Sequence, residues 1–166
     1  MIGCEALKYC LFCGDNLVLK TLLDGSEEKY CTRCDHVFFD SPTPAIIVAV
    51  IMNDQILLTR SVGWNHLYWG LIAGHIKSGE SAEETVVREV GEEVGLKISN
   101  PNFLGTYAHK QRNLLMIGFK TETKEMQIKK SIELEEVSWF KLTKNLPLRP
   151  NSISHHIVEK ILHEIS

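Results

Sequence analysis

The stretch Gly74–Leu96, GHIKSGESAEETVVREVGEEVGL, decides the fold of this chain. Its Ser81 and Glu84 form a capping box, in which each side chain accepts a hydrogen bond from the other residue's backbone amide. Gly95 stands where a helix commonly ends in the left-handed conformation. Between these ends, valine recurs every fourth residue and gives the helix one apolar stripe for a core. The stretch therefore predicts a glycine-containing loop and then an amphipathic helix between Ser81 and Gly95.

Acidic residues occupy a different face of this helix. Glu89, Glu92 and Glu93 stand at i, i+3 and i+4, where side chains are neighbours and like charges cost a few tenths of a kcal/mol per pair. An acidic stripe on its own is simply a solvated face. Here Arg88 adjoins the stripe and the preceding loop adds Glu80. Oxygen ligands gathered in this way suit Mg²⁺ or Mn²⁺, which would relieve the repulsion.

The spacing of these residues resembles one known signature. Residues 74–96 fit the pattern G-x5-E-x7-R-E-U-x-E-E-x-G-U without a gap or mismatch, where U is a bulky aliphatic residue. This pattern is the Nudix box, so the chain is similar to the Nudix hydrolases. The resemblance implies an enzyme that uses Mg²⁺ or Mn²⁺ to hydrolyse a diphosphate linked to a nucleoside.

Composition excludes several other classes of protein. The chain has 166 residues, of which 44% are hydrophobic and 23% charged, as expected for a globular domain with a small added module. A net charge of −3 argues against a broad basic surface for duplex nucleic acid. The longest apolar run, Ala45–Met52, is too short to span a bilayer, and no signal pattern is visible. We therefore expect a cytoplasmic protein with no membrane partner.

Paired cysteines mark the N-terminal part of the chain. Two CxxC motifs stand 17 residues apart and contain Cys10, Cys13, Cys31 and Cys34. In a reducing compartment such pairs usually bind metal, and the spacing predicts a tetrahedral Cys4 zinc ribbon. The zinc would fold about 35 residues that could not otherwise build a core. A redox role is the alternative, and it is disfavoured because neither motif lies at a βα junction.

Two residues near the ribbon could replace one of its ligands. His36 is a reserve ligand that we do not expect to bind, and Cys4 is expected to be a free thiol. Two prolines within Ser41–Pro44 favour an extended connector after the ribbon. We therefore assign residues 1–40 to the zinc ribbon and residues 41–166 to the hydrolase domain.

The second part of the chain alternates strand and helix patterns. Runs rich in β-branched residues predict strands at 45–52, 55–60, 103–109, 114–121 and 135–140, and a terminal helix is expected over 152–165. Strands with helices on both sides imply an α/β/α sandwich, and its sheet is mixed because the hairpins cannot be parallel.

A zinc ribbon upstream of a Nudix box resembles the NADH pyrophosphatase group. Later segments follow that group's order: LMIGF at 115–119, ELEEVSWF at 133–140 and SIS at 152–154. By this resemblance the catalytic metals would be held by the Ala73 carbonyl, Glu89, Glu93 and Glu133. Glu92 would assist the metal or the water, and Glu136 is the fallback for Glu133.

The expected mechanism follows from charge. Cleaving a diphosphate requires neutralising oxygens that gain negative charge, which divalent metals do best at a carboxylate cluster. Glu89 or Glu92 would accept the proton of the attacking water. Arg88 would hold the carboxylates in register through a bidentate contact.

One segment departs from that group's pattern. The group carries the specificity motif SQPWPFPxS just before residue 115, where an ungapped alignment places TYAHKQRNL, residues 106–114. The Trp-Pro-Phe-Pro core of the nicotinamide-side pocket is therefore absent. The polar replacement predicts either a solvent-facing strand edge or a substrate wall whose cations meet phosphate. The candidate substrate-binding residues are Tyr107, His109, Gln111, Arg112 and, by resemblance, Ser154.

The expected reaction is cleavage of an NADH- or NAD-type dinucleotide into two mononucleotides. ADP-ribose or another nucleoside diphosphate derivative is one alternative substrate. NAD-capped RNA is another, less favoured because the ribbon carries few basic residues. A non-catalytic nucleotide sensor is a further alternative, disfavoured because the acidic set is intact. The resemblance also suggests that the ribbon supports a homodimer.

The histidines and one mid-helix glycine carry weaker signals. The seven histidines show no recognisable metal-binding spacing, and His155–His156 is expected to be a surface pair on the terminal helix. Gly91, in mid-helix, costs roughly 1 kcal/mol relative to alanine, and close packing beneath the site is one reason for a glycine there.

Overall fold

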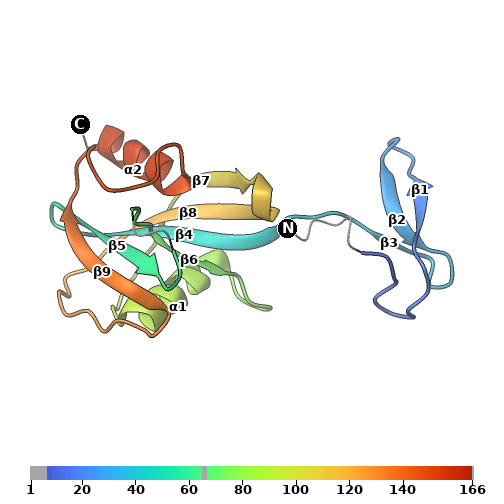
Figure 1. Cartoon of the computed structure of the whole chain (residues 1–166), viewed down its shortest axis with the longest axis horizontal. Helices are drawn as coiled ribbons and strands as arrows, with labels where there is room; N and C mark the ends of the chain where they lie inside the picture. Colours follow the sequence, from blue (N-terminus) through green and yellow to red (C-terminus); the bar gives the residue numbers. More distant parts are fainter. Residues whose placement is uncertain (1–6, 65–66, 166) are drawn as a thin grey trace. The chain divides into compact units, whose positions relative to one another are not determined.

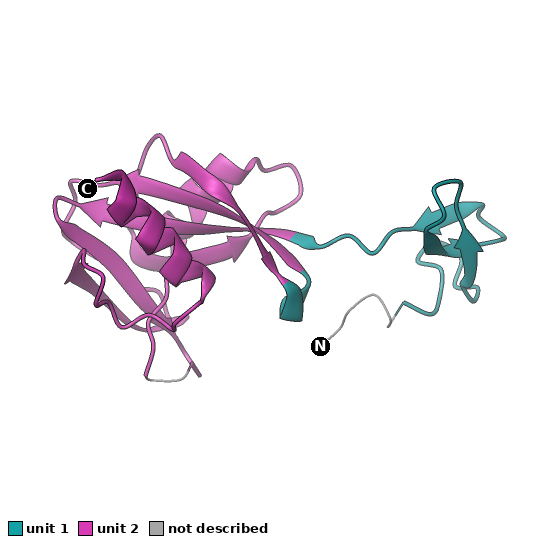
Figure 2. Cartoon of the chain, turned by 90° about the horizontal axis from the view of Figure 1, so that it is seen from above, with its two compact units in different colours: residues 1–43, 110–113 teal, residues 44–109, 114–166 magenta. Residues whose placement is uncertain are grey.

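The computed structural model describes residues 7–64 and 67–165. The chain forms two compact units, Met1–Thr43 with Lys110–Asn113, and Pro44–His109 with Leu114–Ser166 (Figure 2). Cys4 lies outside the described residues, so its role is not tested. No helix in the described part of the chain is long and apolar enough to cross a membrane.

The first unit is built on a small antiparallel sheet. Its strands run in the order β1 (Val18–Thr21), β2 (Glu27–Cys31) and β3 (His36–Phe38). The β1–β2 turn is made by Asp24, whose carboxylate accepts from the Ser26 amide at 3.0 Å, and by Gly25 at φ 86°. Among the described residues of this unit, only two hydrophobic side chains are buried, those of Cys10 and Cys31. The cysteines therefore occupy the place of an apolar core.

The second unit is a sheet with a helix on each side (Figure 1). Its strands are β4 (Thr43–Met52), β5 (Gln55–Ser61), β6 (Ile72–His75), β7 (Asn102–His109), β8 (Leu114–Glu122) and β9 (Leu134–Lys141). The order is β7-β8-β4-β5-β9, with β6 also paired to β4. The two α-helices are α1 (Ala82–Val94) and α2 (Ile153–Glu164), and a short 3-10 helix, η2 (Lys110–Arg112), joins β7 to β8.

The central strand β4 supplies both halves of the core. Alternate residues of a strand point to opposite faces of its sheet. Ile46, Val48 and Val50 pack with the valine stripe of α1. Ala45, Ile47 and Ala49 pack with Ile157, Val158 and Ile161 of α2. Because the two helices contact alternating residues of one strand, they lie on opposite faces, and the predicted α/β/α sandwich is confirmed.

The strand pairing is mixed, as predicted. The ladders β4–β5, β4–β6, β5–β9 and β7–β8 are antiparallel, and a parallel bridge joins Trp69 to Leu148. The five strands expected from the sequence lie within two residues of those observed. The short strand β6 was not predicted as a strand.

Both ends of α1 are capped by the chain that flanks them. The capping box is present: Ser81 N donates to Glu84 at 2.8 Å and Glu84 N donates to Ser81 Oγ at 3.2 Å. At the other end, Gly95 has φ 70° and donates to the Gly91 carbonyl. The loop before β9 then caps two more carbonyls, because Lys129 N donates to Val94 and Ser131 N donates to Glu93, both at 2.8 Å. This loop leads directly to Glu133.

Close packing does not explain the glycine in the middle of α1. Among the described residues, an added Cβ at Gly91 would meet nothing within 4 Å. The expectation of tight packing beneath the site is therefore wrong.

We predict that Gly91→Ala stabilises the protein. Alanine in an exposed helix interior is favoured over glycine by roughly 1 kcal/mol, which should raise the melting temperature by about 2–4 °C. Gly95→Ala should lower it, because φ is 70° and the new Cβ would lie 2.8 Å from the Lys129 Cβ. Thermal unfolding followed by circular dichroism measures both, and equal melting temperatures would contradict the prediction.

Candidate active site and zinc site

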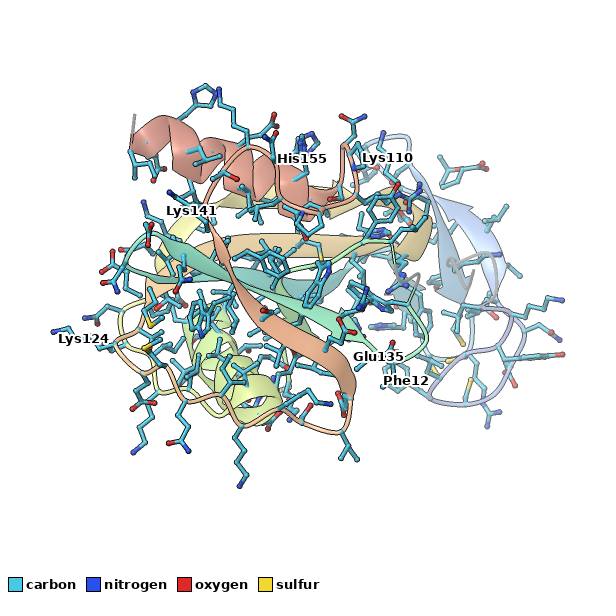
Figure 3. The ribbon with its side chains drawn as sticks, turned by 60° about the vertical axis from the view of Figure 1, so that its left-hand side comes forward. Phe12, Lys110, Lys124, Glu135, Lys141 and His155 are labelled. Carbon is cyan, nitrogen blue, oxygen red and sulfur yellow. The ribbon has the colours of Figure 1, made fainter. Side chains whose placement is uncertain are left out.

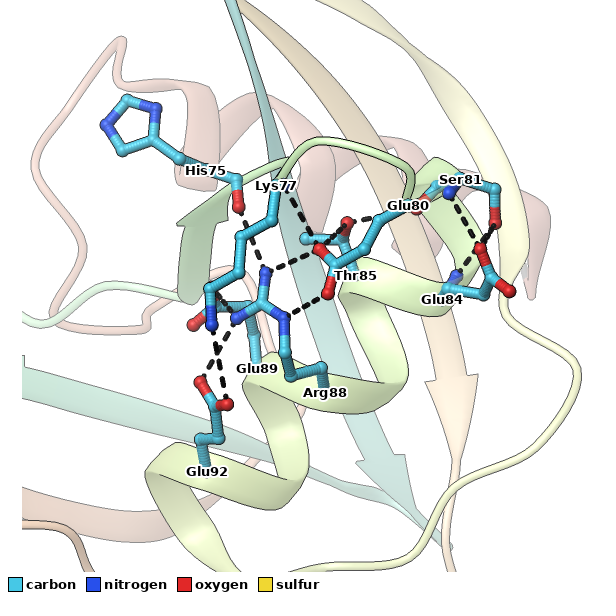
Figure 4. A network of polar contacts seen from close by, with 9 residues as sticks. All are labelled: His75, Lys77, Glu80, Ser81, Glu84, Thr85, Arg88, Glu89 and Glu92. Carbon is cyan, nitrogen blue, oxygen red and sulfur yellow. Dashed lines mark hydrogen bonds and ion pairs between the residues drawn. The ribbon is translucent and has the colours of Figure 1, made fainter.

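One arginine organises the acidic residues of the Gly74–Leu96 stretch (Figure 4). Arg88 donates from Nε and Nη2 to the two oxygens of Glu80, at 2.6 and 2.9 Å. Its Nη1 donates to Glu89 at 2.6 Å and to Glu92 at 3.1 Å, and Nη2 also donates to the His75 carbonyl at 3.0 Å. These five bonds match the five N–H donors of a guanidinium. The bidentate contact predicted for Arg88 is present.

Glu80 anchors this network to the loop before α1. Its Oε2 accepts from the Lys77 amide at 3.1 Å and from Thr85 Oγ1 at 2.9 Å. The Arg88 guanidinium, more than these neutral donors, lowers the pKa of Glu80 to about 2. Glu80 in turn raises the pKa of Arg88 above its ordinary value. Glu80 is therefore ionised at any working pH and serves to position Arg88.

Gly74 is required by the close approach of Glu89. A Cβ built on Gly74 would lie 2.1 Å from Glu89 Cδ and from its Oε1. The Glu89 side chain is only 13% exposed, and its carboxylate lies against Gly74 of β6. The first glycine of the stretch therefore makes room for one of its carboxylates.

Glu93 and Glu133 lie beside Glu89, and among the described residues neither of the two accepts a hydrogen bond from Arg88. Burial is the main cause that raises the pKa of Glu93 to about 7, and the negative charges of Glu89 and Glu133 add to the effect. Glu133 is brought here by the loop that caps α1, where its amide donates to Ser131 Oγ at 3.3 Å. A half-buried carboxylate crowded by two others fits a divalent cation, which is the partner that oxygen ligands of this kind prefer.

The other predicted members of the site lie around these acids. Ala73 is in β6, paired with Ile47 of β4. Glu92 is 55% exposed, and Lys77 Nζ lies 3.6 Å from its Oε1. Among the described residues, three or more ligand atoms lie within 4.8 Å of one another in two groups, the four cysteines and a group on α2. Within the described part of the chain, the carboxylates of α1 do not form such a group. The metal-ligand roles of Ala73, Glu89, Glu92, Glu93 and Glu133 therefore stay predictions.

Glu136, the fallback ligand, has another partner. It faces Arg60 across the β5–β9 ladder, and the two side chains form an ion pair. Arg60 is 8% exposed and its guanidinium carbon lies 4.8 Å from the Trp69 ring centroid. The sequence motifs did not predict this cluster. A charged residue within the apolar run of β5 was the available signal.

The candidate substrate residues of the second unit have different surroundings. Tyr107 packs against the core on the α2 face, and burial raises its pKa. His109, at the end of β7, has a buried Nδ1 with no hydrogen-bond partner among the described residues. In the first turn of α2, Ser154 Oγ accepts from the Leu71 amide at 3.4 Å. Of these three, His109 presents the polar atom that still requires a partner.

Gln111 and Arg112 lie in η2, and both are exposed. By its contacts η2 belongs to the first unit, together with residues up to Thr43. Substrate binding by Gln111 and Arg112 stays a prediction.

The four paired cysteines meet in the first unit, as predicted. Their sulfurs all lie within 4.8 Å of one another, with Cys10 to Cys34 at 3.8 Å and Cys13 to Cys31 at 3.5 Å. A tetrahedral zinc ion with Zn–S bonds of 2.3 Å holds its sulfurs about 3.8 Å apart. The cluster therefore fits zinc, and its separations are far longer than a disulfide's.

Backbone geometry supports this ligand set. The Phe12 amide donates to Cys10 Sγ and the Cys34 amide donates to Cys31 Sγ, both at 3.4 Å. His36 instead packs its ring between Phe12 and Phe38, with centroids 5.1 and 4.8 Å away. As expected, His36 is not among the clustered ligands.

Comparison with known proteins identifies the family. Residues 41–160 match the NUDIX domain. The chain belongs to the NUDIX family. The predicted Nudix resemblance is thereby confirmed, and Nudix enzymes are hydrolases that use divalent metals.

Two curated Nudix relatives and one solved structure are similar to this chain. The NAD-capped RNA hydrolase NudC of Stutzerimonas stutzeri is 32% identical over 93% of this chain and 56% of its own length. That of Pseudomonas aeruginosa strain PAO1 is 32% identical over 91% and 55%. The chain thus spans just over half the length of these relatives. A NUDIX hydrolase structure from Nitrosomonas europaea covers 95% of this chain and 92% of its own, with a TM-score of 0.79 at 18% identity, which shows a shared fold.

We predict that Gly74→Ala disables the Nudix site without unfolding the protein. The new methyl group would displace the Glu89 carboxylate, and a displacement of about 1 Å near the chemistry can cost about 100-fold in rate. Gly91→Ala is the control, because Gly91 is exposed on α1 and an added Cβ there meets nothing within 4 Å among the described residues, so this variant should keep full activity. Steady-state hydrolysis with Mg²⁺ measures both, and equal rates for the two variants would contradict the role given to Gly74.

We also predict that Glu93 makes stability depend on pH in buffer without divalent cations. Its pKa rises from 4.5 to about 7 on folding. The folded protein therefore holds a proton that the unfolded chain has already released, so stability falls as pH rises through this window. Glu93→Gln cannot ionise, and it should raise the melting temperature by about 5–10 °C more near pH 8 than near pH 5. A pH-independent difference from wild type would contradict this.

Proposed function

We propose that the protein is a Mg²⁺- or Mn²⁺-dependent pyrophosphohydrolase that cleaves the diphosphate of a nucleoside diphosphate derivative. The preferred substrate class is an NADH- or NAD-type dinucleotide, which would yield two mononucleotides. The observation that carries the proposal is the acidic cluster on α1 of a chain whose residues 41–160 match the NUDIX domain. Arg88 binds Glu80, Glu89 and Glu92 there, and the half-buried Glu93 is crowded by Glu89 and Glu133. Such crowding is costly in a folded protein, and strongly perturbed acids cluster at functional sites.

The proposed cation ligands are the Ala73 carbonyl, Glu89, Glu93 and Glu133, with Glu92 assisting. Divalent-metal chemistry at such a site neutralises the phosphate oxygens and lowers the pKa of a bound water. Glu89 is held against Gly74 and Arg88, so its carboxylate has little freedom to move. This rigidity suits a ligand that must keep one geometry through the reaction.

Glu92 and Glu89 are the candidates for the general base. Glu92 is half exposed, and its ion-pair partners among the described residues are Arg88 and Lys77. It can therefore turn toward a water more readily than Glu89 can. Arg88 acts by positioning, because all its donors are taken by the loop and the carboxylates.

Substrate contacts are proposed for Tyr107, His109, Gln111, Arg112 and Ser154. His109 is the best supported of these, because its buried Nδ1 has no partner among the described residues. A polar atom in that state favours a ligand with a complementary donor or acceptor.

NAD-capped RNA is the second candidate substrate. The two curated relatives reported above are named for hydrolysis of NAD-capped RNA, and each matches over more than 90% of this chain. An NAD cap contains the same diphosphate as the free dinucleotide, so one site could cleave both. ADP-ribose remains the third candidate because it shares that bond.

The cysteine cluster and the NUDIX match also support a division of the chain. We propose that residues 1–40 form a zinc ribbon with structural Zn²⁺ at the four cysteines, and that residues 41–166 form the hydrolase domain. A homodimer and a cytoplasmic location stay predictions.

The first experiment separates an enzyme from a nucleotide sensor. Glu93→Gln should lose turnover by a factor on the order of 10³ or more, since it removes a charged group from the proposed metal site. Glu83→Gln, an exposed acid in the first turn of α1, is the matched control and should keep wild-type turnover. A wild-type protein that binds nucleotide but never hydrolyses it would support the sensor.

The substrate is settled by a panel assayed with Mg²⁺ or Mn²⁺ and read by mass spectrometry. It contains NADH, NAD⁺, ADP-ribose and NAD-capped RNA. We expect the dinucleotides to be cleaved into two mononucleotides. Faster cleavage of the capped RNA at equal concentration would move the assignment to RNA, and cleavage of ADP-ribose alone would exclude a dinucleotide pocket.

A further inference from the structure

Helix α2 carries three potential metal ligands that the Nudix chemistry does not use. The nitrogens of His155 and His156 and a carboxylate oxygen of Glu159 all lie within 4.8 Å of one another. Apart from the cysteines, this is the only such group in residues 7–64 and 67–165. Figure 3 labels His155 where it projects from α2.

The helix itself brings these residues together. Glu159 stands four residues after His155 and three after His156, the two spacings at which helical side chains are neighbours. The two rings project about 100° apart around the axis, and Glu159 projects between them. Adjacent histidines alone predicted a surface pair, and Glu159 adds the third donor between them.

The distances suit a shared ion better than a direct contact. His155 Nδ1 lies 3.6 Å from Glu159 Oε2, which is too long for a hydrogen bond. Two ligands of a tetrahedral Zn²⁺, at 2.0–2.1 Å each, lie about 3.3 Å apart. Small side-chain rotations would therefore bring both atoms to one ion.

His155 supplies a second, independent observation. Its Nδ1 is buried and has no hydrogen-bond partner among the described residues, although the side chain as a whole is 31% exposed. His155 and Glu159 also line a cavity of about 140 Å³ beneath α2. Leu148, Val158 and Leu162 contribute apolar walls to this cavity. A buried imidazole nitrogen without a hydrogen-bond partner still requires one, and a metal ion is a partner that imidazole binds readily.

We propose that His155, His156 and Glu159 bind a borderline divalent transition ion, with Zn²⁺ as the type ligand. Imidazole with carboxylate suits zinc, copper or nickel, in contrast to the all-oxygen set of α1. Three protein ligands leave one coordination position for water, as in open zinc sites. The site lies on α2, across the sheet from α1, so it is distinct from the Nudix carboxylates.

The test is a Zn²⁺ titration of the full chain by calorimetry. The protein must carry no polyhistidine tag, must already hold zinc at its cysteines and must be kept in excess Mg²⁺, which occupies oxygen sites. We expect one further equivalent of Zn²⁺ to bind. Saturation with the cysteine-bound zinc alone, measured by elemental analysis after desalting, would overturn the proposal.

Single substitutions locate the ion. His156→Ala and Glu159→Gln alter exposed side chains. Loss of a residue that only supports a metal ligand typically lowers metal affinity by roughly 10–100-fold. Loss of a ligand itself should weaken Zn²⁺ binding by at least that factor. Glu122→Gln is the control, an exposed acid at the end of β8 outside the group, and should bind as wild type. Circular dichroism confirms that each variant is folded.

Two results would move the ion elsewhere. If Glu93→Gln abolishes the additional binding while His156→Ala preserves it, the zinc binds at the carboxylates and the α2 site is excluded. Equal affinities for wild type, His156→Ala and Glu159→Gln would exclude it as well.

Discussion

The guanidinium of Arg88 is the interaction on which the rest of the site depends. It joins the loop before α1 to three carboxylates of that loop and helix, using all five of its donors. A lysine has three donors and no planar fork, so it could not make the bidentate contact to Glu80 and reach the others as well. Without this cation, the acids would repel one another along the helix and the loop would lose its anchor.

Arg88 neutralises only some of the acidic residues of the site, and the others keep a repulsion that a cation can relieve. Glu93 lies beyond the network, crowded by Glu89 and Glu133, and its pKa is raised. It also stands in the last turn of α1, where the helix dipole disfavours negative charge and where no basic residue is present. The helix therefore keeps an arrangement that weakens the metal-free fold and suits a divalent cation.

Local sequence signals predicted much of this structure because their physical causes are local. The capping box, the left-handed Gly95 and the valine stripe each depend on residues within one helix, and all three are observed. The spacing of the cysteines predicted that their sulfurs would cluster. A unit with so little buried apolar surface also requires another source of stability, which a metal site can provide. The strand β6 escaped prediction because four residues with a glycine carry too little periodicity.

The sequence by itself therefore determined the family, the helix that carries the acids and the four clustered cysteines. Only the tertiary structure decided which neighbours each side chain meets. In the folded chain, Glu136 forms an ion pair with Arg60, and the Glu89 carboxylate lies against Gly74. The loop that caps α1 places Glu133 beside Glu93. These contacts join residues far apart in the chain, and strand register and loop path, which periodicity does not encode, decide whether they form.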